Sequence, residues 1–352
     1  MALLWIDGFD HYGANGSRLA ASAKGAYDVL LDNSDTVLVS SPQTGGQGVQ
    51  LSATGGEGFA LSKVYPAPYA SGSLGVGFHL VFPAGTFNTH DLVAFVASDS
   101  SWPYRVILNQ NTGKLTINDP SGTTIGTSAG VLVPGTFYHV EIKLVIAGSS
   151  GGSIEVRIGG STFLAVTGIT TNAKSIGQIA FDQRISGGSA CVFNMDNLFL
   201  WDGTGSVNNN WIGEKKVYTS LPSADTVDAD WTLSTGTSGF DLINDVPAVD
   251  ATRYLESSTV GDVSIFETAN VVPASLAVAG VMTAVRAEKT DSGAGTLEFG
   301  PVHAGVPSLA SKAQTNSQYL WATKIDELNP STSAPWTVTE VNAAQIELRR
   351  AA

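Results

Sequence analysis

Short stretches of alternating apolar and polar residues recur along the chain, separated by turns rich in Gly. Alternation with a period of two indicates a half-buried strand, because successive side chains point to opposite faces of a sheet. Two such stretches, residues 3–10 and 193–205, lie at the two ends of a strand-rich region. Pairing of its first and last strands would close a sandwich. The pattern therefore predicts one self-contained β domain over residues 1–205.

Two hairpins are predicted inside this region. Residues 104–109 and 114–118 flank one Gly-containing turn, and residues 137–146 and 153–158 flank another. The stretch 74–82 places its larger side chains on one face and glycine on the other. Further strands are expected at residues 36–40, 48–52, 58–65, 92–97, 162–166, 176–182 and 190–201.

A Gly/Ser/Asn-rich stretch at residues 203–210 indicates a linker, and a second strand-rich region follows it. A short helix is predicted over residues 337–344, because Thr337 can cap it and Glu340 can complete a capping box. The predicted fold class is all-β, with two β-sandwich (jelly-roll) domains in tandem, residues 1–205 and 211–352. The strands expected in the second domain are residues 212–218, 231–233, 254–256, 263–266, 277–288, 295–299, 317–323 and 345–349.

Three pieces of the first region resemble the concanavalin-A-like or laminin-G-like jelly roll. They are residues 138–144, 154–160 and 195–199, and they occur in the order that this family shows. The resemblance covers most of residues 1–205. It implies a sandwich that recognises surfaces and that can hold calcium through loop oxygens at its rim.

The second half resembles a domain common in structural proteins of tailed bacteriophages. The matching residues end in the stretch 329–342, with Asn329 where that domain usually has Asp and Ser333 where it has Gly. The opening residues 5–13 also resemble the start of phage virion proteins with a lectin-like fold. The resemblance implies a place in a virion assembled in the bacterial host cytoplasm, contacts with other virion proteins, and a homo-oligomer, first expected to be a trimer.

The composition limits the classes of partner that we expect for this protein. Asp and Glu number 31 against 18 Lys and Arg, for a net charge of −13, and such a surface repels nucleic-acid phosphates. No stretch reaches about 18 uninterrupted apolar residues, so membrane insertion is not expected. The N-terminus also lacks the pattern of a signal peptide. The lone Cys191 excludes an internal disulfide and is expected to be a small buried hydrophobe.

The sequence lacks recognised catalytic patterns. No Glu-x-Asp-x-x-Glu run of the kind found in glycosidases of this architecture occurs, and the adjacent Asp326 and Glu327 would point to opposite faces of a strand. Asp225, Asp228 and Asp230 lie in a loop-like stretch and are expected to be solvated turn residues. No nucleophile elbow or phosphate-binding loop occurs. The histidines are scattered without zinc-ligand spacing, and His139 is expected to be a packed residue. These observations predict a protein that is not an enzyme and needs no cofactor or metal. The five histidines are His11, His79, His90, His139 and His303.

Two groups of residues are candidates for binding. Trp102 and Tyr104 lie beside a strand start, where aromatic rings can stack on a sugar, and Tyr65 and Tyr69 bracket a proline-rich loop suited to a neighbouring subunit. Oxygen donors near strand ends raise the possibility of calcium, but we expect them to cap turns instead. These donors are Asp91, Asp99, Asn109 and Asp119.

The leading interpretation is a non-enzymatic structural component of a tailed-phage virion, such as a decoration, spike or fibre protein on head, neck or tail. The alternative is a carbohydrate-binding module that recognises a host-surface glycan. A glycan depolymerase is the third interpretation, and the missing carboxylate pair disfavours it.

Overall fold

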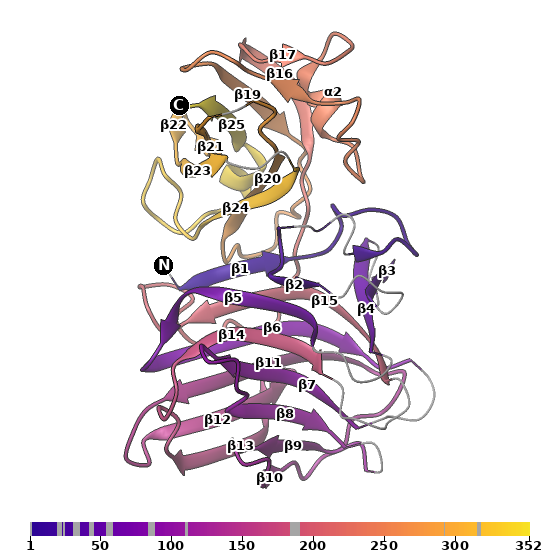
Figure 1. The fold of residues 1–352 in the computed structure, drawn as a ribbon, viewed down its shortest axis with the longest axis vertical. Coiled ribbons are helices and arrows are strands. Elements are labelled where there is room, and N and C mark those ends of the chain that lie inside the picture. The colour runs from indigo at the N-terminus through magenta and orange to yellow at the C-terminus, as the bar shows by residue number, and fades with distance from the viewer. Residues whose placement is uncertain are drawn as a thin grey trace. The chain divides into compact units, whose positions relative to one another are not determined.

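The computed structural model describes residues 2–19, 23, 25–30, 36–41, 46–53, 59–83, 89–109, 112–183, 191–291, 293–314 and 318–352. The chain is nearly all β, which confirms the predicted fold class (Figure 1). Its contacts divide it into two compact units. Unit 1 comprises Met1–Asp10, Ala14–Ala21 and Tyr27–Val217, and unit 2 comprises His11–Gly13, Ser22–Ala26 and Tyr218–Ala352. The tandem of two independent jelly rolls stays a prediction.

Unit 1 consists of antiparallel strands in two sheets. These strands are β1 (Leu3–Asp7), β2 (Val29–Leu30), β3 (Thr36–Ser40), β4 (Gln47–Ala53), β5 (Phe59–Tyr69), β6 (Gly72–Val81), β7 (His90–Ala97), β8 (Tyr104–Leu108), β9 (Leu115–Asn118), β10 (Thr124–Thr127), β11 (Phe137–Ile146), β12 (Gly152–Ile158), β13 (Ser161–Ile169), β14 (Ile176–Gln183) and β15 (Cys191–Asp202). The eight-stranded sheet has the order β13-β12-β11-β6-β15-β4-β3, with β1 paired to β15. The seven-stranded sheet has the order β10-β9-β8-β7-β14-β5-β2.

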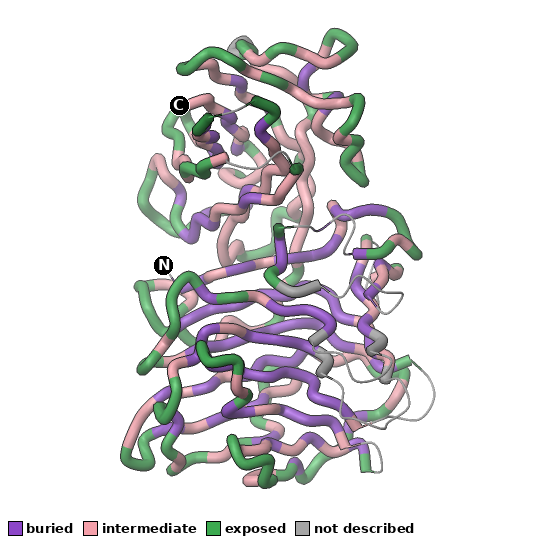
Figure 2. The backbone as a smooth tube through the Cα atoms, viewed as in Figure 1, coloured by how far each residue is buried: buried purple, intermediate pink, exposed green. Residues whose placement is uncertain are grey.

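The first and last strands of unit 1 pair, as predicted. Leu3 lies opposite Trp201 and Asp7 opposite Leu198. Both predicted hairpins are also confirmed, as β8–β9 and β11–β12. Buried positions run along the strands of this unit (Figure 2). Phe78 of one sheet meets Phe181 of the other edge to face at 5.7 Å, so the core lies between the two sheets.

Strand β6 has a different kind of residue on each face, as its pattern predicts. Its apolar side chains at 74, 76, 78 and 80 are fully buried in the core. On the opposite face a Cβ atom at Gly75 would lie 2.0 Å from the indole of Trp201, and one at Gly77 would lie 2.0 Å from the ring of Phe199. Glycine is required at both positions because these rings lie directly over the β6 backbone.

The proline-rich stretch 65–69 is not a loop, in contrast to the prediction. It forms the end of β5, which pairs with β14 through an irregular register between Val64 and Tyr69. Proline cannot donate to a regular ladder, so it is tolerated in strands at such irregularities. The side chain of Cys191 and parts of the predicted turn around residue 111 lie outside the described residues.

Unit 2 is built on one larger sheet of order β16-β19-β25-β21-β22, with β23 paired to β21. Two further strand pairs, β17–β18 and β20–β24, accompany it. Seven of its predicted strands are confirmed, whereas β16, β22 and β23 were not anticipated. Its elements are β16 (Pro222–Ala229), β17 (Thr232–Leu233), α2 (Gly239–Ile243), β18 (Leu255–Glu256), β19 (Val263–Thr268), β20 (Val281–Ala287), β21 (Gly295–His303), β22 (Val306–Pro307), β23 (Ala310–Gln314), β24 (Leu320–Asp326), α3 (Val338–Asn342) and β25 (Gln345–Arg350).

The predicted C-terminal helix is α3. The Thr337 side chain accepts from the Glu340 N–H while the Glu340 carboxylate accepts from the Thr337 N–H, which completes the capping box. In the turn before it, Ser333 has φ of 56°, a left-handed conformation that explains why Gly suits this position. Asn329 Oδ1 accepts from the N–H of Ser331, so Asn performs the turn-capping role expected of Asp.

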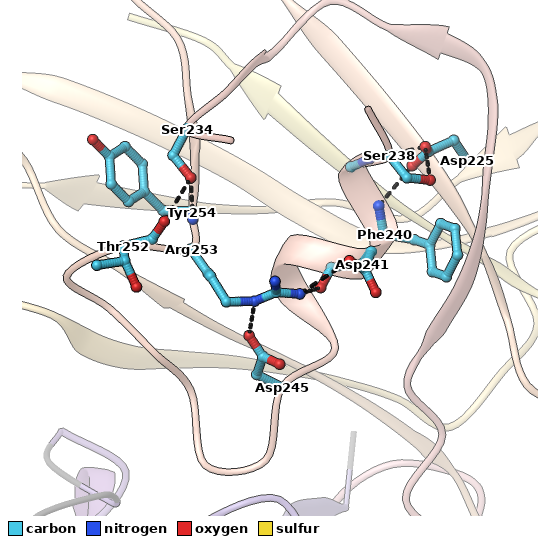
Figure 3. A network of polar contacts seen from close by, with 10 residues as sticks. Asp225, Ser234, Ser238, Phe240, Asp241, Asp245, Thr252, Arg253 and Tyr254 are labelled. Carbon is cyan, nitrogen blue, oxygen red and sulfur yellow. Dashed lines mark hydrogen bonds and ion pairs between the residues drawn. The ribbon is translucent and has the colours of Figure 1, made fainter. Parts of the chain in front are cut away.

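A polar network in unit 2 stabilises the start of helix α2 through a residue of strand β16 (Figure 3). The Asp225 carboxylate accepts from the Ser238 hydroxyl at 2.9 Å and from the N–H groups of Gly239 and Phe240 at 2.8 and 2.7 Å. Nearby, the Arg253 guanidinium pairs with Asp245 and Asp241. Asp225 therefore has a structural role, and it lies in β16 rather than in a solvated turn.

Replacing Asp225 with alanine is expected to reduce the free energy of unfolding of unit 2 by about 1–2 kcal/mol, the usual cost of losing a helix N-cap. Denaturant unfolding followed by tryptophan fluorescence measures this loss. Glu256→Ala is the matched control, because Glu256 is an exposed carboxylate in β18. Equal stability of the two variants would show that Asp225 does not hold α2.

Candidate functional site

Three adjacent strands of the eight-stranded sheet place ionisable side chains side by side on its outer face. His79 of β6 lies directly opposite His139 of β11 and directly opposite Asp196 of β15. Residues opposite each other in a sheet point to the same face. We call Asp196, His79 and His139 the polar row. It spans two strand spacings, about 10 Å.

Burial changes the proton affinities in the polar row. The three side chains are between 1% and 4% exposed. Burial, together with the nearby carboxylates of Asp10 and Asp7, raises the pKa of Asp196 to about 6, although the hydrogen bonds from Ser41 and Asn197 act to lower it. Burial and the neighbouring His79 lower the pKa of His139 to about 4. The row thus holds a carboxyl that stays protonated to a higher pH than usual and, on the other side of His79, an imidazole that stays neutral to a lower pH than usual.

A β-bulge positions His79. Strand β15 shifts register between Asp196 and Phe199, and Asn197 has φ of 51° in the left-handed region. The Asn197 Oδ1 atom accepts from the Val217 N–H at 2.6 Å, so its Nδ2 atom faces His79 Nδ1 at 2.9 Å as a donor. The proton of neutral His79 therefore lies on Nε2, which faces the Glu214 carboxylate at 3.3 Å.

His139 has unused hydrogen-bonding capacity. Among the described residues, neither of its ring nitrogens has a hydrogen-bond partner. The ring lies 5.5 Å from that of His79 and stacks at 6.3 Å on Phe199. A buried imidazole without a partner is costly. Such a group is a candidate for contact with a ligand.

Charged and aromatic side chains extend the face beyond the row. Glu141, Lys143 and Arg157 follow on β11 and β12, and Glu141 is fully buried. The Trp211 ring lies 4.0 Å from the Arg157 guanidinium and 4.7 Å from the Lys143 ammonium, and 6.4 Å from the ring of Trp201. The face therefore combines an acid–base row with cations and aromatic surface.

Residues 210–217, which we call the strap, lie over this face. The prediction of a strand at 212–218 is wrong, because the strap pairs with no strand and contacts side chains instead. The Glu141 carboxylate accepts from the N–H of Ile212 at 2.9 Å and from that of Gly213 at 3.1 Å. Burial still raises the pKa of Glu141, against these hydrogen bonds.

The four aromatic residues predicted for binding do not form one site. Tyr65 and Tyr69 lie on β5, while Trp102 and Tyr104 lie at β8, and strands β7 and β14 separate β8 from β5 in the seven-stranded sheet. Tyr65 and Tyr104 are buried, which leaves little of either ring for a partner. Tyr69 donates its hydroxyl to Asp202 and Tyr104 to the Thr170 carbonyl. Trp102 is 39% exposed, and a glycan contact there stays a prediction.

The oxygen donors weighed for calcium have structural partners. Asp99 accepts from the N–H of Ser101, and Asp119 accepts from the N–H groups of Ser121 and Thr123, so both cap turns as predicted. Asp91 is buried and pairs with Arg105 at 3.2 Å. Over the described ranges, no group of three or more His, Cys, Asp or Glu is placed to hold a metal ion. Within the same ranges, no helix is long and apolar enough to cross a membrane.

No protein-family model matches the chain, and no curated protein matches it. Among solved structures it is similar to alginate lyase Aly36B, at 14% identity and a TM-score of 0.40, over 57% of this chain and 95% of that one. It is also similar to the cellulose-induced protein Cip1, at 14% identity and a TM-score of 0.41, over 60% and 100%. A third is an endo-β-1,4-glucuronan lyase from the fungus Trichoderma reesei, at 11% identity and a TM-score of 0.37, over 51% and 93%.

These findings correct two expectations. The chain was expected to be a non-enzymatic structural component of a virion, whereas the similar structures include polysaccharide lyases. At such identities the likeness concerns the fold, and no activity passes from those proteins to this chain. No pattern within one strand indicates the polar row, because it is built from three strands.

Proposed function

We propose that unit 1 is a carbohydrate-active unit that performs acid–base chemistry on a glycan chain at the polar row. The observation that carries this proposal is the row itself, in which Asp196, His79 and His139 lie side by side with shifted pKa values. Perturbed ionisable groups gathered on one face are typical of functional sites. Flanking aromatic rings and a few convergent polar groups are typical of sites that bind small molecules and sugars.

The roles follow from the proton affinities. Hydrolysis of a glycosidic linkage needs one group that donates a proton to the leaving oxygen and one that takes a proton from the water that attacks the anomeric carbon. Asp196, with its pKa raised to about 6, is the proton donor. His139, with its pKa lowered to about 4 and no protein partner among the described residues, is the acceptor. His79 separates the two and is held in one tautomer by Asn197.

The pH profile tests this assignment. The competent form has Asp196 protonated and His139 neutral, so it is most populated between pH of about 4 and about 6. Below that window His139 gains a proton, and above it Asp196 loses one. We expect kcat/KM for release of sugar ends from a panel of soluble polysaccharides to follow a bell centred near pH 5. A rate that rises steadily to pH 8 would exclude Asp196 as the acid.

The place of this activity in an organism stays a prediction. The resemblance to tailed-phage virion proteins favours a particle-borne unit that meets a host-surface glycan. Contacts with other virion proteins and a trimeric state belong to the same prediction.

A further inference from the structure

We propose that the strap is displaceable, and that it occupies the path of a glycan chain across the eight-stranded sheet until the glycan replaces it. This inference rests on the proposed function, because it concerns access to the same polar row. It would explain how groups buried in the resting protein come to meet a substrate.

The strap crosses the strands in the order in which they lie in the sheet. Its Trp211 contacts Arg157 of β12, Ile212 and Gly213 contact Glu141 of β11, and Glu214 faces His79 of β6. The last contact is made to β15, where Asn197 accepts from Val217. The sheet order is β12-β11-β6-β15. An extended polymer that replaced the strap would meet the Arg157 and Lys143 cations first and then the polar row.

The strap is bound in the manner of a ligand rather than as part of the sheet. Three of its backbone N–H groups donate to side chains of the face, and it forms no ladder with a strand. Residues 211–217 are half-buried or exposed, whereas Glu141, His79 and His139 beneath or beside them are buried. The strap therefore covers buried side chains of the sheet while it remains in partial contact with solvent itself.

The chain before the strap suits a hinge. Residues 203–210 form no strand, and Gly205 and Asn208 have φ of 76° and 53°. Asn209 donates to the Gly205 carbonyl at 3.0 Å inside this stretch. Its two ends contact the sheet, because the Gly203 N–H donates to the Ser73 carbonyl at 2.8 Å and the Lys143 ammonium donates to Asn210 Oδ1 at 3.1 Å. When the strap leaves, Glu141, Asn197 and His139 all offer hydrogen-bonding atoms to an incoming chain.

Hydrogen exchange of the full-length protein tests the inference directly. Trp211→Ala removes the ring that packs against Arg157 and Lys143. Ile212→Pro removes the N–H group that donates a hydrogen bond to Glu141. We expect either variant to speed exchange of the amides at Gly213 and Val217 by about tenfold or more, and to speed sugar release several-fold. Val131→Ala is the control, since Val131 is 49% exposed and lies outside both the strap and the stretch before it, and it should change neither rate.

Soluble probes separate this inference from the proposed function. Alginate and xylan are added to the wild-type protein, and the probe that is cleaved is expected to speed exchange of the strap amides. Strap amides that exchange as slowly as those of β11, with and without either probe, would overturn the inference. Exchange that speeds up with a probe while no sugar ends appear would support the strap and refute the acid–base function. Cleavage that is insensitive to both strap variants would refute the strap alone.

Discussion

Replacing His139 with alanine is expected to lower kcat/KM for glycan cleavage by about 10²–10⁴-fold, the usual contribution of a positioned acid–base group. Both nitrogens of this imidazole lack a hydrogen-bond partner among the described residues, so their loss breaks no protein hydrogen bond. The ring is packed against Phe199 and His79, and its truncation leaves a cavity. The variant is therefore expected to be somewhat less stable. Its kcat/KM is measured on protein that circular dichroism shows to be folded, and it should fall by far more than partial unfolding could explain.

His90→Ala is the matched control for this experiment. His90 is also a buried histidine of unit 1, but it lies on β7 of the other sheet, where its ring stacks on Phe193 at 5.5 Å. This variant loses a similar packed ring and keeps the polar row. We expect a lower melting temperature with kcat/KM within about threefold of wild type. An equal activity loss in both variants would assign the effect to stability rather than to proton transfer.

The framework of unit 1 could be predicted because its determinants are local. Alternation along β1 and β15 marks both strands, and the Gly75 and Gly77 positions mark the face on which large rings lie. Gly-containing turns mark the hairpins β8–β9 and β11–β12. Each of these signals is contained within a few residues of sequence.

The polar row could not be predicted in the same way. His79, His139 and Asp196 meet only because β6 pairs with β11 on one side and with β15 on the other, each in the register that places its polar residue opposite His79. A shift of one residue in either pairing would turn the partner side chain to the opposite face. One local signal was available: His139, Glu141 and Lys143 alternate along a predicted strand and share one face. This alternation indicates a polar face of β11, but it does not indicate which side chains of the neighbouring strands lie beside it.

The strap shows a second limit to predicting structure from local sequence patterns. Residues 212–218 are predicted to be a strand, yet residues 212–217 lie across strands and donate N–H groups to Glu141 and Asn197. A local sequence pattern does not distinguish a segment that pairs with a sheet from one that lies on its face. The acceptors that hold the strap are side chains far away in the sequence, so no local pattern indicates them.

Trp336→Ala is expected to be the most destabilising change in unit 2. The indole is 3% exposed, its Nε1 atom donates to the Asp326 carbonyl at 3.1 Å, and it lies 5.9 Å from the His303 ring. It thereby joins the start of the α3 segment to the end of β24 and to β21. Truncation of a buried Trp costs about 3–5 kcal/mol, a large fraction of the stability of an ordinary domain.

Calorimetry of the full chain measures this effect, and Trp102→Ala is the matched control because its indole is 39% exposed. We expect the Trp336 variant to lower the melting temperature of unit 2 by about 10 °C or more, and the Trp102 variant to change stability by less than about 1 kcal/mol. The polar row lies wholly in unit 1, so glycan cleavage at 25 °C should survive the Trp336 change. A site confined to the eight-stranded sheet needs only unit 1 to be folded. If unfolding of unit 2 also abolished cleavage, the two units would unfold as one.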